Sequence, residues 1–408
     1  MNNKVETMKK KSKHTLTPRL RFPEFRDKPG WEPTPLSALL DYEQPGKYIV
    51  QDSNYQDTGT PVLTANKSFV LGHTAEITDA FEDVPVIIFD DFTTDKKYVD
   101  FPFKVKSSAI KILRSRGKDE LKLIYELMSR IRFDPAQHKR YYISEYQNLE
   151  IALPSPPEQQ KIAECLSSLD GVIAAEGRKL AALRDHKRGL MQQLFPQPGQ
   201  TQPRLRFPEF RDKGEWVNKL LDELGERGSG HTPDKKKPEY YNGGIKWVSL
   251  ADSKRLDQGL ISETEIEISE QGLKNSSAVL HPAGTVILSR DAGVGKSAVL
   301  AEKMAVSQHF IVWKCNSRQL LNWFLYYLLQ KLKSLFEEIA TGSTIKTIGL
   351  PFFKALRITI PTVEEQHRIA DCLTALDTRI NAQATKIETL KQHKRGLMQQ
   401  LFPAPEEV

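Results

Sequence analysis

Cysteine is scarce in this chain, with three among 408 residues. Cys165, Cys315 and Cys372 form no CxxC pair and no even-numbered set, which argues against a disulfide framework and against a zinc site. We therefore predict no bound metal. A reducing compartment suits these thiols better than secretion, so we expect a cytoplasmic protein.

Long apolar runs are also missing. The most apolar segment, Leu320–Leu329, is about half as long as a helix that crosses a bilayer, and it predicts a buried helix instead. The Lys-rich stretch Met1–His14 is not followed by the apolar segment of a signal peptide, which leaves a short basic tail as the expectation. No membrane partner is predicted.

Recognisable catalytic motifs are absent from the sequence. Gly293–Ser297 resembles part of a nucleotide-binding P-loop, but the first glycine of that motif is replaced by Arg290. Pro233-Asp234 followed by Asp252-Ser253-Lys254 matches a nuclease pattern only formally, because acid-x-Lys triplets arise by chance in a chain with 27% charged residues. No Asn/Asp-Pro-Pro-aromatic motif of adenine methyltransferases occurs either. We therefore predict no catalytic residue.

What the chain does contain is an internal repeat. Pro18–Lys28 (PRLRFPEFRDK) recurs unchanged as Pro203–Lys213, and Lys187–Pro196 (KRGLMQQLFP) recurs as Lys394–Pro403. Pro154–Asp170 recurs with modest changes as Pro361–Asp377. The blocks in between, roughly 31–153 and 217–360, show little resemblance to each other. A duplicated frame with two divergent inserts predicts one architecture that presents two different surfaces.

The repeated segments at the ends of the blocks predict two long helices. Apolar residues alternate at spacings of four and three, which is a heptad pattern. Each helix would have about 37 residues and a length of roughly 55 Å. Glu176 and Lys187 interrupt the first seam, as Gln383 and Lys394 interrupt the second, and these polar positions are hypothesised to fix register. The predicted seam residues are Ile162, Leu166, Leu169, Ile173, Leu180, Leu183, Leu190, Leu194, Ile369, Leu373, Leu376, Ile380, Ile387, Leu390, Leu397 and Leu401.

These patterns predict an α+β protein with two mixed α/β domains joined by two antiparallel coiled-coil helices. The alternative is that each helix lies independently on its own domain. The expected segments are a tail and first arm (1–30), a first domain (31–153), a first helix (154–196), a linker with the second arm (197–216), a second domain (217–360), a second helix (361–403) and a tail (404–408).

Loops in both domains mix basic, aromatic and small polar residues. Lys and Arg neutralise phosphates and bind guanine, and Asn, Ser and Thr can contact other bases. The net charge of +7 and the pI near 9.0 permit a nucleic-acid partner without requiring one. Solvated basic loops are common, so the argument depends on their recurrence in both domains.

The chain resembles the specificity subunits of Type I restriction-modification systems. The resemblance covers nearly the whole chain and rests on the two PRLRFPEFR arms, on PEQQKIAECLSSLD and EEQHRIADCLTALD, on KRGLMQQLFP twice, and on ATGSTIKTIGLPFFKALRITIP from Ala340. The segments PVLTANKSFVLGHT and HTPDKKKPEYYNGGIKWVSLAD resemble target recognition domains of two different specificity groups.

This resemblance implies a subunit without catalysis of its own. Each target recognition domain would bind one half of a split, asymmetric site in double-stranded DNA, with the helices as a spacer. Partners would be two modification (methyltransferase) subunits that carry S-adenosylmethionine and two restriction (translocase-endonuclease) subunits that use ATP and Mg²⁺. This chain itself would carry no cofactor, and it would belong to a bacterium or archaeon.

The residues that we predict to contact DNA lie in the loops of the two domains. The segment Thr341–Lys346 has an alternative role as a plain turn at the end of a helix. The predicted contacts are Lys47, Thr64, Asn66, Lys67, Lys96, Tyr98, Lys139 and Arg140 in the first domain, and His231, Thr232, Lys235, Arg290, Lys296, Ser343, Thr344 and Lys346 in the second.

Two other hypotheses remain open at this point. One is a coiled-coil scaffold whose end domains bind partners other than DNA, which would show little salt-dependent binding to duplexes. The other is an enzyme in its own right, which would show methylation or cleavage with this chain alone.

Overall fold

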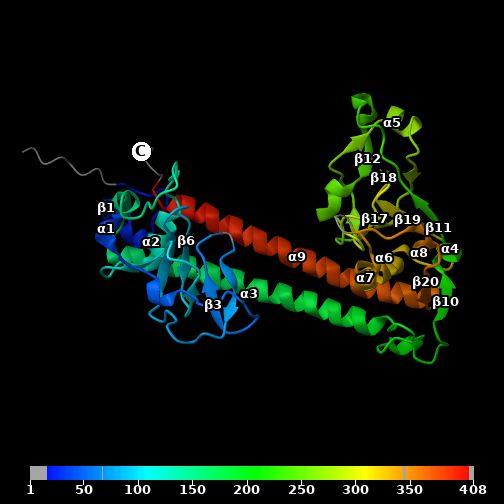
Figure 1. Ribbon diagram of the computed structural model, residues 1–408, viewed down its shortest axis with the longest axis horizontal. Helices are drawn as coiled ribbons and strands as arrows, with labels where there is room; N and C mark the ends of the chain where they lie inside the picture. The colour runs from blue at the N-terminus through cyan, green and yellow to red at the C-terminus, as the bar shows by residue number, and fades with distance from the viewer. Residues whose placement is uncertain (1–15, 67, 343–345, 404–408) are drawn as a thin grey trace, which may run out of the picture. The chain divides into compact units, whose positions relative to one another are not determined.

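The computed structural model describes residues 16–66, 68–342 and 346–403 of the chain. It divides into two compact units (Figure 1). Unit 1 contains the residues up to Ala175 together with those from Ile387 onward, and unit 2 contains Glu176–Lys386. Each unit therefore holds one globular domain, the beginning of one long helix and the end of the other.

Unit 1 is closed by a strand pair that joins the two ends of its domain. β1 (Glu32–Pro35) pairs antiparallel with β9 (Glu150–Leu153), and the short α1 (Leu36–Leu39) follows β1. An antiparallel sheet then has the order β2-β8-β5-β6. Its strands are β2 (Leu40–Glu43), β5 (Val86–Asp90), β6 (Lys96–Val99) and β8 (Ile110–Ser115).

The central strand β5 separates two cores of unit 1. All five of its residues are buried, and successive side chains of a strand point to opposite faces. Ile87 and Phe89 pack toward α2 (Leu121–Met128) and the long helices, whereas Val86 and Ile88 pack toward a second, smaller sheet. That sheet has the order β4-β3-β7 and consists of β3 (Thr60–Leu63), β4 (Val70–Thr74) and β7 (Lys104–Val105).

Unit 2 repeats this plan. β10 (Val217–Leu220) pairs antiparallel with β20 (Arg357–Ile360), and α4 (Leu221–Leu224) follows β10. The main sheet has the order β11-β19-β16-β17-β13, with strands β11 (Gly225–Ser229), β13 (Leu260–Ile261), β16 (Val286–Ser289), β17 (Ser297–Leu300) and β19 (Phe310–Cys315). The second sheet, of order β14-β12-β18-β15, contains β12 (Tyr241–Val248), β14 (Glu267–Ile268), β15 (Leu280–His281) and β18 (Met304–Val306).

The helices of unit 2 cover the main sheet and supply much of its largest core. α6 (Asn322–Lys331) buries every side chain from Phe324 to Leu329, which confirms the predicted buried helix. α7 (Lys333–Ile339) and α8 (Leu350–Lys354) add Phe336 and Phe353 to the same core. The short α5 (Glu270–Lys274) packs beside β12 instead. No helix in the described part of the chain is long and apolar enough to cross a membrane.

The two domains share one framework although their sequences show little resemblance. In the main sheets, β2, β8, β5 and β6 of unit 1 correspond in order to β11, β19, β16 and β17 of unit 2. In the second sheets, β3 pairs parallel with β7 and β12 pairs parallel with β18. The blocks thus diverged in their side chains and loops and kept the order of their central strands.

Two helices of 39 residues, α3 (Pro156–Leu194) and α9 (Val363–Leu401), follow the domains. They run antiparallel, as expected: within unit 1 the start of α3 lies beside the end of α9, and within unit 2 the end of α3 lies beside the start of α9. The predicted seam residues are all buried or half-buried. Ile162, Leu166, Leu194, Ile369, Leu373, Leu376, Ile387 and Leu401 are buried, and Leu169, Ile173, Leu180, Leu183, Leu190, Ile380, Leu390 and Leu397 are half-buried.

The repeated arms dock on the long helices through a buried charged pair. In unit 1, Arg21 donates from Nε and Nη2 to the two carboxylate oxygens of Glu158, both at 2.6 Å. In unit 2, Arg206 makes the same two bonds to Glu365 at 2.8 and 2.7 Å. This bidentate geometry matches a guanidinium to a carboxylate, and it explains why one arm sequence serves both units.

Candidate nucleic-acid interface

One hairpin in each main sheet organises the loops that surround it. In unit 1 it connects β5 to β6 through residues 91–95, and in unit 2 it connects β16 to β17 through residues 290–296. Both are sharp, with backbone φ of 60° at Thr94 in the first and of 112° and 84° at Gly293 and Gly295 in the second. Because these strands occupy corresponding places, the two hairpins are structural equivalents.

Asp91 anchors the unit 1 hairpin. Its backbone N donates to Ala109 O and its backbone O accepts from Tyr141 N, both at 2.8 Å. Its carboxylate forms an ion pair with Lys111 at 3.1 Å and accepts a hydrogen bond from Tyr142 N at 2.8 Å. Both charged side chains are 1% exposed, so this pair is structural and fixes the loop after β7 and the segment near residue 140 against the hairpin.

Several predicted DNA contacts gather around this hairpin. Thr93 Oγ1 donates to Asn66 Oδ1 at 3.2 Å, and Thr64 lies in the same loop as Asn66. The guanidinium of Arg140 lies over the ring of Phe92, 5.8 Å from its centroid. Lys139 is next in sequence and pairs with Glu145 at 2.5 Å. These loops form an exposed polar and aromatic surface in unit 1.

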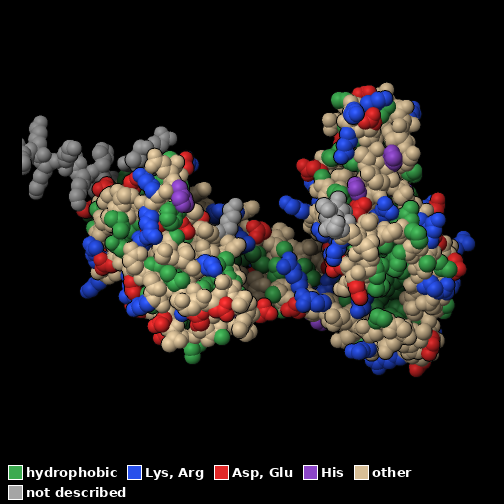
Figure 2. Space-filling model, in the orientation of Figure 1, with side chains coloured by type: hydrophobic (Ala, Val, Ile, Leu, Met, Phe, Trp, Pro, Cys, Tyr) green, Lys and Arg blue, Asp and Glu red, His purple; other side chains and the backbone are tan. Residues whose placement is uncertain are grey.

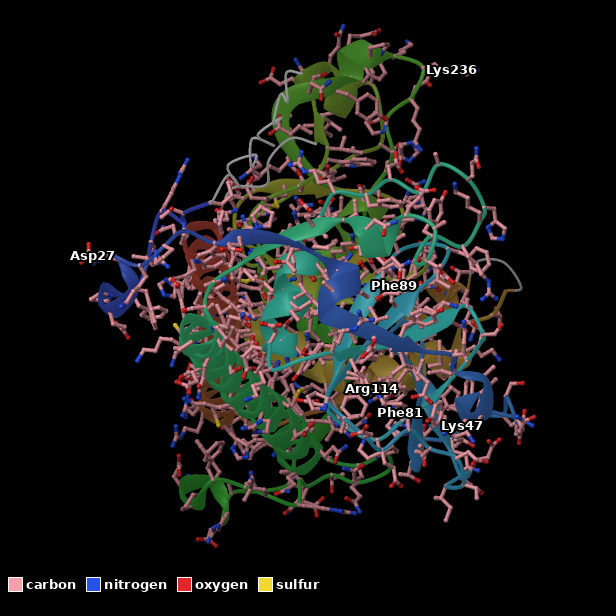
Figure 3. The ribbon with its side chains drawn as sticks, turned by 90° about the vertical axis from the view of Figure 1, so that its left-hand side faces the viewer. Asp27, Lys47, Phe81, Phe89, Arg114 and Lys236 are labelled. Carbon is pink, nitrogen blue, oxygen red and sulfur yellow. The ribbon has the colours of Figure 1, made fainter. Side chains whose placement is uncertain are left out.

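Three other predicted contacts have different surroundings. Lys47 pairs with Glu43 at 3.9 Å at the outside of the unit, whereas Phe89 lies within it (Figure 3). Lys96 is turned inward, where its ammonium donates to Tyr146 Oη at 2.9 Å, and burial lowers its pKa to about 8. Tyr98 lines an acidic hollow of about 440 Å³ beside α3, with Asp100 and Glu164. The inward ammonium of Lys96 and the acidic surroundings of Tyr98 do not favour a DNA contact, whereas the contact of the exposed Lys47 stays a prediction. Lys67 is outside the described residues.

The unit 2 hairpin is anchored in the same manner. Arg290 N donates to His309 O at 3.0 Å, and Ile348 N donates to Arg290 O at 2.9 Å. These bonds correspond to those that Asp91 makes in unit 1. The segment of Ile348 is itself closed by a reciprocal backbone pair between Thr341 and Thr347. Thr341 and Thr347, at the two ends of the predicted turn, therefore lie close to the hairpin. Ser343 and Thr344 are outside the described residues.

A basic hollow of about 500 Å³ lies next to this hairpin. Lys296, Lys333 and Lys346 line it together with one acid, Glu337. Lys333 is paired with Asp257 at 2.8 Å, and Lys296 donates to the backbone and hydroxyl oxygens of Ser253. Lys346 is exposed, which makes it the freest of these ammonium groups to meet a phosphate.

His231 and Thr232 reach the same region from another loop. His231 N donates to Val306 O at 3.1 Å, and the Thr232 hydroxyl donates to Gln308 Oε1. Gly230 permits this approach, since a Cβ there would lie 1.7 Å from Val306 O. Lys235 is exposed on the following loop, whose Lys236 lies at the outside of the unit (Figure 3). Lys235 is part of that loop and makes none of the backbone bonds that hold the hairpin.

The residues predicted from the sequence do not include several side chains of these clusters. They are Phe92 and His138, whose rings stack at 4.7 Å in unit 1, and Asp291, Gln308 and His309 in unit 2. Their position in the sequence indicates these residues, because each of the two hairpins follows a fully buried β-strand. Charge gave no such signal, because Figure 2 shows Lys and Arg side chains interspersed with Asp and Glu on the visible faces. Among the described residues, no group of three or more His, Cys, Asp or Glu side chains could hold a metal ion.

The fold and these loops define a protein with two divergent recognition domains on one repeated helical frame. Comparisons with known proteins give the same class. Residues 213–392 match the family model of the Type I restriction modification DNA specificity domain. The specificity subunit of the Type I restriction enzyme EcoR124I/EcoR124II of Escherichia coli is 32% identical over 404 residues, which covers 92% of this chain and 95% of that subunit. The MjaVIII specificity subunit of Methanocaldococcus jannaschii is 23% identical and covers 90% of this chain and 88% of its own length.

Solved structures support the fold independently. A Type I restriction-modification S subunit from M. genitalium superposes with a TM-score of 0.60 at 14% identity, over 96% of this chain and all of that one. A chain from a structural study of complex assembly and conformational transition of the Type I system gives 0.52 at 17% identity, over 90% and 98%. The chain belongs to the family of Type I restriction-modification specificity subunits.

Proposed function

We propose that this chain recognises a bipartite, asymmetric site in double-stranded DNA, with each unit binding one half. The observation that carries the proposal is the pair of equivalent hairpins. Each is held by the same backbone bonds within the same strand order, yet the side chains around the two differ. One framework with two chemistries suits two unlike half-sites, since phosphate contacts can position each domain while different side chains contact the bases. Family membership does not favour the alternative of a scaffold for partners other than DNA.

The chain would act without catalysis and without a cofactor of its own. S-adenosylmethionine would be held by modification subunits, and ATP with Mg²⁺ by restriction subunits, in the cytoplasm of a bacterium or archaeon. The long helices would set the distance between the two recognition domains. This assignment rests on the family and on the absence of a recognisable catalytic motif from the sequence.

Two copies of the modification subunit would bind, one to each unit. The support is a surface that occurs twice. In unit 1 the arm meets the end of α9, where Leu20 N donates to Gln400 O at 2.9 Å, and in unit 2 Leu205 N donates to Gln193 O at the same distance. Exposed positions on these segments are identical in the two copies: Arg19, Leu20, Pro23, Glu24, Arg26, His393, Arg395, Gln399 and Gln400 in unit 1, and Arg204, Leu205, Pro208, Glu209, Arg211, His186, Arg188, Gln192 and Gln193 in unit 2.

The stability of the fold does not require these exposed residues to be identical in the two units. Substitutions at exposed positions usually change stability by less than about 0.5 kcal/mol, and exposed positions midway along the same helices do differ. Val172 corresponds to Arg379, and Ala174 corresponds to Asn381. A surface preserved in both units fits one partner that binds twice. Two restriction subunits would then join the complex.

The decisive experiment is a methylome. The chain is expressed with its modification subunit, and modified adenines are mapped across the host genome. We expect one split motif with two unlike halves and a fixed spacer. No new methylation from a stable complex of the two proteins would overturn the proposal. Native mass spectrometry of that complex tests the stoichiometry: Leu20→Asp and Leu205→Asp should each remove one of two modification subunits, and retention of both copies in both variants would argue against the repeated surface.

A further inference from the structure

The turn between β18 and β19 lies against the unit 2 hairpin and has an equivalent in unit 1. In unit 2, Ser307 N donates to Val248 O and His309 O accepts from Arg290 N. In unit 1, Lys106 N donates to Leu63 O and Ala109 O accepts from Asp91 N. The backbone of the turn is therefore held by the same two bonds in both units.

The side chains of the two turns differ strongly. The unit 1 turn carries Lys106, Ser107, Ser108 and Ala109, whereas the unit 2 turn carries Ser307, Gln308 and His309. At the position whose carbonyl accepts from the hairpin, Ala109 of unit 1 corresponds to His309 of unit 2, so a ligand contact there can differ without a change in the core. The turn is thus a place where the two half-sites can acquire different sequences.

Asp291 orients the imidazole of His309. Asp291 Oδ1 lies 2.7 Å from His309 Nδ1, and the two side chains are 14% and 31% exposed. A carboxylate accepts only, so this contact keeps the proton of a neutral imidazole on Nδ1. The other nitrogen, Nε2, is then an acceptor. In the major groove it matches the exocyclic amino group of adenine or cytosine.

Gln308 is oriented in a comparable way. Its Oε1 accepts a hydrogen bond from the Thr232 hydroxyl, while the side chain as a whole is exposed. The amide therefore keeps its Nε2 as a donor with a fixed direction. A donor at this point matches the N7 or O6 of guanine, the N7 of adenine or the O4 of thymine.

We propose that Gln308 and the Asp291–His309 pair determine the base sequence of the second half-site, with His309 accepting from an adenine or cytosine amino group. Lys346, in contrast, meets a phosphate at the rim of the basic hollow. The inference rests on the proposed function and deepens it, because it separates residues that choose the sequence from residues that only hold the duplex.

The experiment uses the full chain in complex with its modification subunit. The wild-type methylome supplies the motif, and duplexes are then made in which each base pair of both half-sites is changed one at a time. Binding is measured for wild type, His309→Ala, Asp291→Asn and Gln308→Ala. Gln271→Ala removes an exposed amide from α5 of the same unit and serves as the matched control.

We expect His309→Ala to lower affinity for the cognate duplex about 10- to 100-fold and to become indifferent to the identity of one base pair of the second half-site. Asp291→Asn should weaken the same preference, because the amide no longer fixes the proton on Nδ1. Gln308→Ala should lose discrimination at another pair. Discrimination at the first half-site and the behaviour of Gln271→Ala should match wild type.

Wild-type discrimination at every base pair in both His309→Ala and Gln308→Ala would overturn the inference. So would an equal loss for all sequences, which is the signature of a phosphate contact. Thermal unfolding of each variant guards against misfolding; if His309→Ala does not fold, the exposed Gln308 and the isosteric Asp291→Asn variant decide the matter. A wild-type complex with no sequence preference would instead remove the proposed function, and this inference with it.

Discussion

Gln383 and Glu176 occupy equivalent positions in the repeated helices, and they contact each other. Gln383 Nε2 donates to Glu176 Oε2 at 2.6 Å and to Glu176 O at 3.1 Å. In an antiparallel pair, equivalent residues meet only at the local two-fold axis between the helices. The repeats differ at this position, because one has a glutamate and the other a glutamine. An amide donor therefore meets a carboxylate acceptor, whereas two glutamates in contact would repel each other.

Replacing the amide by a second acid tests that arrangement. Gln383→Glu should destabilise the helix pair at neutral pH, because two carboxylates in contact cannot both ionise without cost. Gln392→Glu, an exposed site on α9, is the control. The measurement is thermal unfolding by circular dichroism at pH 7. An equal effect of the two substitutions would contradict the axis contact.

The pH dependence of the same contact has a defined sign. The hydrogen bond from Lys386, followed by that from Gln383, lowers the pKa of Glu176 in the wild type. Its contribution is therefore present above the carboxyl's unfolded pKa and is lost as pH falls through the lower folded value. In Gln383→Glu one carboxyl should instead have a raised pKa, so the variant should approach wild-type stability as pH falls toward about 4. Melting curves at a series of pH values check this.

Each unit contains one of two reciprocal ion pairs between the long helices. Lys187 contacts Asp377 at 2.6 Å in unit 2, and their repeat equivalents Lys394 and Asp170 contact each other at 2.8 Å in unit 1. Asp377→Lys should cost about 1–3 kcal/mol, since it places two ammonium groups together in a partly buried site and removes the acceptor for Tyr327 Oη. Adding Lys187→Asp should restore part of the loss. A double-mutant cycle measured by denaturant unfolding gives the coupling energy, and strict additivity would show that the pair does not interact.

Periodic patterns made the frame predictable, because heptads and prolines are local signals. The expected helix of about 37 residues is found with 39, and the expected α/β character of both domains is confirmed. The shared strand order was not foreseen, since strand pairing joins residues far apart in the chain and sequence identity between the blocks is low. Solvated and inward-turned lysines also look alike in a sequence. Lys96 was predicted to face DNA, and only the packing of Tyr146 shows why its ammonium points inward.

The inward ammonium of Lys96 should make the stability of the folded chain depend on pH. Burial lowers its pKa to about 8, so the folded state disfavours its charged form. A lowered lysine pKa means that wild-type stability rises with pH between about 8 and the unfolded value near 10.4. Lys96→Met should therefore be more stable than wild type at pH 7, by at most about 3 kcal/mol, and should lose that advantage toward pH 10. Urea unfolding at both pH values measures it.

The same variant decides whether Lys96 contacts DNA. With an inward ammonium, Lys96→Met should leave the affinity and its salt dependence unchanged. A slope of log K against log salt that flattens by about 0.9 would instead restore the phosphate contact predicted from the sequence.

Asp91 should be essential to unit 1 for a structural reason. Asp91→Ala leaves the buried Lys111 ammonium without its carboxylate and the Tyr142 N–H without its acceptor, so a loss of about 3–5 kcal/mol is expected. Asp95→Ala, in the same hairpin but exposed, should cost far less. Replacing both partners, as Asp91→Leu with Lys111→Met, should recover much of the loss in denaturant unfolding. A double variant as unstable as Asp91→Ala would show that the carboxylate matters for its hydrogen bonds rather than for the charge of Lys111.

Lys346 should affect one half-site only. It is exposed at the rim of the basic hollow of unit 2, and we expect its ammonium to neutralise one phosphate there. Lys346→Ala should therefore weaken binding about equally for all second half-site sequences and lower the salt slope by about 0.9, while base discrimination at the first half-site stays intact. Lys354→Ala, an exposed lysine of α8 away from the hollow, controls for net charge. Comparison of duplexes that keep only one cognate half-site separates the outcomes: equal losses at both halves would mean that Lys346 acts through overall charge and not through a local phosphate.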